Sequence, residues 1–71
     1  MPQTGPTSQQ TNPHAVLEAA LAKERAAHRF YDSKAQTATL AVVRDLLLRL
    51  KDEEAKHIRL IEGLLAKLDL G

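Results

Sequence analysis

The chain has 71 residues, a net charge of +1 and no cysteine. A chain of this length buries little core on its own, so we expect it to need a metal or a partner for stability. The absence of cysteine excludes disulfides and thiolate metal sites, and the interspersed charges provide no basic surface for nucleic acid or an anionic membrane.

The first predicted segment is a disordered N-terminal tail over residues 1–12, which is rich in Gln, Thr, Pro and Gly and has nothing to bury. It lacks the apolar stretch of a signal peptide. No apolar run approaches the roughly 18–20 residues that span a bilayer, so no membrane partner is expected. The protein is therefore expected in the cytoplasm.

A first helix is predicted from Pro13 to about Thr37, because Asn12 is a suitable N-cap and Pro13 suits the first helical position. One stripe of this helix repeats at three- and four-residue steps, and a glutamate interrupts it midway. Its members are Leu17, Leu21, Glu24, His28, Tyr31 and Ala35.

Residues 36–39 are the predicted connection, in which Thr39 can cap a second helix from Leu40 to about Leu68. Few β-branched or aromatic residues follow residue 13, so the fold class is all-α and residues 13–71 form one helical hairpin. The second helix carries a continuous seam that is aliphatic except for two residues in its middle, Glu54 and His57. The seam comprises Leu40, Val43, Leu47, Leu50, Glu54, His57, Ile61, Leu64 and Leu68.

Further apolar residues lie beside both stripes, so the apolar arc is too wide for one facing helix. A symmetric pair of hairpins that forms a four-helix bundle is the simplest way to cover it. We therefore expect a homodimer or a multiple of dimers. The residues concerned are Val16, Phe30, Val42, Leu46, Leu60 and Leu65.

The polar residues of the two stripes are predicted to meet. With the turn at about residue 39, Glu24 and Glu54 each lie roughly 22 Å from it along antiparallel helices. His57 lies one turn beyond Glu54 on the same face. Two carboxylates and an imidazole in an apolar seam are costly unless they bind a cation, and two-fold symmetry would double their number. The pattern is typical of di-iron carboxylate bundles.

The segment from Glu24 to His57 resembles one half of a rubrerythrin or ferritin-like bundle. The pattern of that family is a ligand glutamate, an aromatic pair, and a leucine-rich segment that leads into E-x-x-H. The corresponding residues here are Glu24, Phe30-Tyr31, Leu47, Leu50 and Glu54-Ala55-Lys56-His57. The sequence is most similar to the short two-helix encapsulated ferritins, which form their bundle by dimerisation.

The resemblance implies that Glu24 is a terminal ligand, Glu54 a bridging carboxylate and His57 a terminal imidazole of a di-iron centre shared between two chains. It also implies that Tyr31 lies close to the metal, whereas the residue pattern alone equally allows an ordinary core tyrosine. His28 could be a further ligand, a proton carrier or a packed seam residue. Manganese or zinc could replace iron, although carboxylate-rich ligation fits iron and manganese better than structural zinc.

The function implied by the resemblance is oxidation of Fe(II) by dioxygen or peroxide, a ferroxidase-type or peroxidase-type activity in iron handling. The chain lacks the cysteine-bearing rubredoxin domain of full rubrerythrins. Its ending, LLAKLDLG, is typical of a continuing helix, so the C-terminus does not support an encapsulin shell as a partner. The alternative is a non-enzymatic helical dimerisation module, in which Glu54 and His57 would be polar specificity residues.

Overall fold

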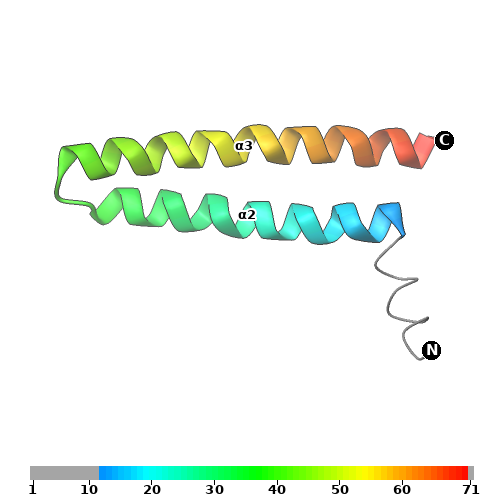
Figure 1. The fold of residues 1–71 in the computed structure, drawn as a ribbon, viewed down its shortest axis with the longest axis horizontal. Helices are drawn as coiled ribbons and strands as arrows, with labels where there is room; N and C mark the ends of the chain where they lie inside the picture. The colour runs from blue at the N-terminus through cyan, green and yellow to red at the C-terminus, as the bar shows by residue number, and fades with distance from the viewer. Residues whose placement is uncertain (1–11, 71) are drawn as a thin grey trace, which may run out of the picture.

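The computed structural model of the protein describes residues 12–70, which form an antiparallel pair of helices (Figure 1). Helix α2 spans Pro13–Thr37 and helix α3 spans Ala41–Leu70, with residues 38–40 between them. The predicted all-α hairpin is thereby confirmed, and no strand occurs within the described residues. The disordered tail predicted for residues 1–12 lies outside the described residues except for Asn12.

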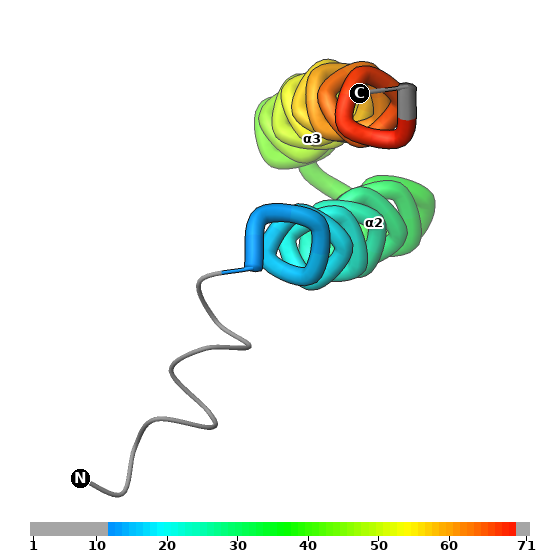
Figure 2. Tube along the Cα trace, turned by 90° about the vertical axis from the view of Figure 1, so that its right-hand side faces the viewer, coloured from blue at the N-terminus to red at the C-terminus, as the bar shows by residue number. Residues whose placement is uncertain are grey.

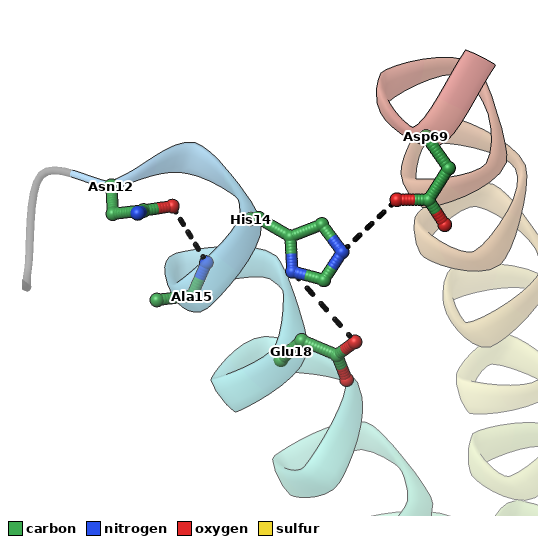
Figure 3. A network of polar contacts seen from close by, with 5 residues as sticks. All are labelled: Asn12, His14, Ala15, Glu18 and Asp69. Atoms are coloured by element: carbon green, nitrogen blue, oxygen red, sulfur yellow. Dashed lines mark hydrogen bonds and ion pairs between the residues drawn. The ribbon is translucent and has the colours of Figure 1, made fainter.

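The start of α2 follows the predicted capping chemistry. The Asn12 side-chain Oδ1 accepts a hydrogen bond from the Ala15 amide at 3.1 Å (Figure 3), and Pro13 begins the helix. At the start of α3, the backbone carbonyl of Leu40 accepts a hydrogen bond from the Arg44 amide. Leu40 therefore holds the cap position that was predicted for Thr39, a shift of one residue that is ordinary at helix ends.

The two helices pack along α2's predicted stripe, all of whose members are buried or partly buried. Leu21 and Ala35 of this stripe are fully buried, as is Leu65 of α3. On α3, however, the residues that pack against α2 are rotated from the predicted seam. The buried or partly buried residues of α3 are Leu47, Leu50, Lys51, Glu54, Ala55, Ile58, Ile61 and Leu65. The exposed members of the predicted seam are Leu40, Val43, His57, Leu64 and Leu68.

On one broad face of the hairpin, three ion pairs join the two helices. His14 Nε2 lies 3.2 Å from Asp69 Oδ1 near the open end (Figure 3). Farther along the same side, Arg25 pairs with Glu62 at 2.8 Å. The third pair, between Lys51 and Asp32 at 3.2 Å, lies toward the turn. These contacts leave the opposite face as the one available for packing.

The opposite face is largely apolar and uncovered. On each helix, this face carries the residues that lie next to the buried stripe, on the side away from the ion pairs. Figure 2 shows that the hairpin is a single layer of two helices, so no third element covers this face within residues 12–70. Neither of the two described helices contains an apolar stretch of the length that a bilayer span requires. The exposed large apolar residues on this side are Val16, Phe30, Val42, Val43, Leu46, Leu60, Leu64 and Leu68.

Candidate metal centre

The three predicted ligands come together midway along the hairpin. Glu24 lies on α2, and Glu54 and His57 lie one turn apart on α3. Each offers one potential ligand atom, and these three atoms all lie within 4.8 Å of one another. Counting residues from the turn predicted that Glu24 and Glu54 lie at the same height, and the structure agrees. The reason is that both helices rise by the same distance per residue from one short turn.

His57 lies beside both carboxylates and is hydrogen-bonded to one of them. Its Nδ1 lies 3.0 Å from Glu24 Oε1, within hydrogen-bonding distance, and 3.6 Å from Glu54 Oε1, beyond it. The exposed fraction of the side chain falls from 51% for His57 to 28% for Glu24 and 16% for Glu54. His57 therefore lies at the surface of the site, and Glu54 lies at its base.

Glu54 holds the least satisfied polar atom of the group. Its Oε1 is buried and has no hydrogen-bond partner. Burying a carboxylate oxygen without a donor costs free energy, and a bound cation removes that cost. An unpaired carboxylate oxygen beside a second carboxylate and an imidazole nitrogen is a donor set that fits a divalent metal. The residues present therefore fit the metal centre that the sequence predicted.

The pKa values of the three side chains reflect how close they lie to one another. The contact with the Glu24 carboxylate raises the pKa of Glu54, and desolvation raises it further. The contact with Glu54 lowers the pKa of Glu24, as does its hydrogen bond to His57. The hydrogen bond to Glu24 raises the pKa of His57. Without metal, protons therefore compensate part of the negative charge that two adjacent carboxylates bring.

The other two predicted residues are not members of this group. His28 is partly buried on α2 and is not among the residues whose ligand atoms converge. Tyr31 is also partly buried, and its ring packs edge-on against Phe30 with centroids 5.6 Å apart. Within residues 12–70, no hydrogen bond joins Tyr31 to Glu24, so its proposed place beside the metal stays a prediction.

The comparisons with known proteins agree with this geometry. The sequence model of the rubrerythrin family matches residues 15–71, which include both helices and all three converging side chains. No curated protein and no solved structure matched the chain. The family match covers most of the chain, and domains of this kind are ferritin-like and generally bind iron.

Proposed function

The chain belongs to the rubrerythrin family, and on this premise we propose that two copies build a di-iron carboxylate centre that oxidises Fe(II) with dioxygen or peroxide. The buried, unpaired Oε1 of Glu54 carries this proposal, because it lies beside the Glu24 carboxylate and the His57 imidazole. A purely structural seam would gain stability from an aliphatic residue at that position.

A second copy is needed because one chain brings only three ligand side chains to the group. Two irons in a carboxylate bundle use four carboxylates and two imidazoles, which is twice the set found here. The apolar face also favours pairing, since an exposed apolar surface of this extent is typical of an interface. Half of the His57 side chain is exposed, so a partner could reach it.

Each residue of the group has a separate task in this proposal. Glu54, the least exposed of the three, would be the bridging carboxylate. Glu24 and His57 would be terminal ligands. Iron, when bound, supplies the electrons that reduce the oxidant. The carboxylates balance the added positive charge after oxidation. The Nδ1 proton that His57 donates to Glu24 must leave before this nitrogen can bind metal, so loading releases protons.

Anaerobic titration of metal-free protein with Fe(II), together with its mass in solution, tests the proposal. We expect about one iron per chain in a dimer or a multiple of it. Admitting oxygen should then produce ferric absorbance. The variant Glu54→Gln keeps the shape of the side chain but should lose the bound iron. Glu62→Gln is the matched control, because Glu62 lies exposed on the same helix outside the group.

A second function is favoured by the apolar face considered alone, namely a helical pairing module that uses no metal. In that case Glu54 and His57 would only select the pairing partner or register. If the wild-type protein bound no iron, or if Glu54→Gln bound as much iron as wild type, the di-iron function would be excluded. The pairing module would then be the function that remains.

A further inference from the structure

The apolar face of the hairpin carries one repeating stripe on each helix, and the two stripes have the same spacing. Each recurs at alternating four- and three-residue steps, the spacing of helix pairs whose side chains interlock. The stripe on α2 comprises Val16, Ala20, Lys23, Ala27, Phe30 and Lys34, and the stripe on α3 comprises Leu46, Leu50, Glu53, His57, Leu60 and Leu64. Apart from the partly buried Leu50, their large apolar members are between 44% and 72% exposed.

Packing along these stripes turns the metal ligands toward a shared interior. In a four-helix bundle each helix meets two neighbours, and the interior lies between the two lines of contact. His57 is itself a member of the α3 stripe. Glu54 lies about 80° around α3 from the centre of that stripe, between it and Leu65, which α2 buries. Glu24 lies in the same way between the α2 stripe and Ala35, which α3 buries.

Both stripes are symmetric about the level of the ligands. The α2 stripe is symmetric about residue 25 and the α3 stripe about residue 55, which directly follow Glu24 and Glu54. These two carboxylates lie at one height in the hairpin. A single two-fold axis perpendicular to the helices can therefore cross both stripes at their midpoints. Around this axis, α2 packs antiparallel against α2 of the second copy, and α3 packs antiparallel against α3.

The sizes of the facing side chains on α2 suit this register. Phe30 of each copy lies opposite Ala20 of the other, so a large side chain meets a small one twice. The Phe30 ring is 54% exposed, although Tyr31 contacts it edge-on and Lys34 Nζ lies 5.7 Å from its centroid. A ring that packs over alanine is covered without a clash, which close packing requires.

The facing charges on α3 also suit this register, because Glu53 of each copy lies opposite His57 of the other. His57 contacts Glu24 through Nδ1, so its Nε2, on the other side of the ring, points away from the ligand group. Within residues 12–70, Nε2 of His57 has no hydrogen-bond partner. Glu53 contacts Lys56 Nζ through Oε2 at 3.4 Å, which leaves Oε1 to accept a bond. An imidazole that binds metal usually donates its other N–H to a carboxylate.

We propose that a second copy packs on the apolar face around this axis, with Phe30 of each chain against Ala20 of the other and His57 Nε2 of each chain donating to Glu53 of the other. The role of Glu53 rests on the proposed function, since it is a positioning residue that orients the metal-binding imidazole. The contact uses Nε2, which is not the ligand atom, so it forms with or without metal. Each chain thus completes the site of its partner.

Disulfide cross-linking tests the register, because the wild-type chain contains no cysteine. Leu46 of each copy faces Leu64 of the other, whereas within one chain they lie about 27 Å apart, too far for a disulfide. The variant with both Leu46→Cys and Leu64→Cys should form disulfide-linked dimers on oxidation. The control with Leu48→Cys and Ala66→Cys has the same spacing on exposed positions away from the apolar face and should not. Equal cross-linking of both variants, or none of the first, would overturn the register.

Exchanging side-chain sizes on α2 provides a second test. Ala20→Phe should weaken the dimer about tenfold or more by opposing two phenylalanines, while circular dichroism shows intact helices. Adding Phe30→Ala should restore dimerisation, which sedimentation measures. The control Ala22→Phe adds the same bulk at an exposed position of α2 outside the stripe and should leave the dimer unchanged. A double variant that dimerises as weakly as Ala20→Phe would contradict the pairing.

A double-mutant cycle on the dissociation constant of the dimer tests the contact at the axis. It is measured at pH 6, below the raised pKa of His57, so that both ring nitrogens carry protons. Glu53→Ala should weaken the dimer about tenfold or more, because two contacts are lost per dimer. Glu53→Gln keeps an acceptor oxygen and should recover part of this loss. Asp52→Ala removes an exposed carboxylate of α3 outside the stripe and should have little effect.

The second side of the cycle separates a contact between chains from one within a chain. In His57→Ala protein, Glu53→Ala should change the dissociation constant little, because its partner is already gone. Equal weakening in both backgrounds would overturn the contact between Glu53 and His57 of the two chains. If His57 instead bonded Glu53 of its own chain, the dissociation constant would show no coupling either.

All three tests use iron-free protein, so their failure is distinct from failure of the proposed function. Protein that pairs as expected but binds no iron would overturn the metal centre and keep the register. Protein that binds one iron per chain without the Leu46–Leu64 cross-link would keep the metal centre and overturn the register.

Discussion

Replacing Glu54 with leucine should make the metal-free protein more stable and abolish its response to metal. Glu54 is 16% exposed, and its Oε1 has no hydrogen-bond partner, with His57 Nδ1 lying 3.6 Å away. Leaving a buried polar group unpaired costs about 1–3 kcal/mol, and the residual exposure favours the lower end of that range. Leucine removes this cost and adds apolar contact with α2.

The size of the effect is measurable by thermal melting. For a domain of this size, 1 kcal/mol corresponds to a change in Tm of about 4–8 °C. We therefore expect Glu54→Leu to raise the Tm of the metal-free protein by at least about 4 °C at fixed protein concentration. Wild type should gain about 2.7 kcal/mol from metal at a hundred times its Kd, whereas the variant should gain nothing.

The matched control is Glu62→Leu, which makes the same change at an exposed position of α3. It removes the half-exposed ion pair with Arg25, so its Tm should fall slightly rather than rise, and its response to metal should persist. A destabilised metal-free Glu54→Leu protein would refute the view that Glu54 is retained for metal binding. Retention of the wild-type metal response would refute it equally.

Three further predictions concern protonation, capping and the ion pairs. The raised pKa values of Glu54 and His57 mean that the folded, metal-free protein holds these protons more tightly than the unfolded chain. This stabilisation is fully present below the ordinary values of 4.5 and 6.5 and is lost as pH rises through the raised ones. Melting of metal-free protein between pH 6 and 8 should therefore show a falling Tm, less steep in His57→Gln; an equal slope in both would argue against the contact with Glu24. Asn12→Ala should cost about 1 kcal/mol in chemical unfolding, because it removes the bond to the Ala15 amide, and Asn12→Ser should recover most of it. Arg25→Ala should cost about 0.2–1 kcal/mol, since the pair with Glu62 is half exposed, and added salt should reduce the difference from wild type.

Much of the site was predictable because it depends on local geometry. Glu54 and His57 share a helix face whenever the segment is helical, since residues three apart are neighbours. Glu24 reaches the same level because the helices are uninterrupted and the turn is short. Position along the axis thus follows from counting residues, and the three side chains were predicted to meet on that basis.

The rotation of α3 about its own axis could not be obtained in this way. Its sequence carries overlapping apolar repeats, and periodicity does not say which of them α2 covers. The structure places Ile58 and Leu65 against α2 and leaves Leu64 and Leu68 exposed. The predicted seam thus lies between the face that α2 covers and the open one.

The amino-acid sequence by itself determined the two helices, their hairpin and the height at which Glu24, Glu54 and His57 meet, because rise, capping and periodicity are properties of a single helix. Only the tertiary structure decided which face is closed by ion pairs and which stays apolar. It alone left Glu54 Oε1 buried without a hydrogen-bond partner. The physical reason is that burial and pairing depend on how one helix is turned toward another, and this is settled by packing along their whole length.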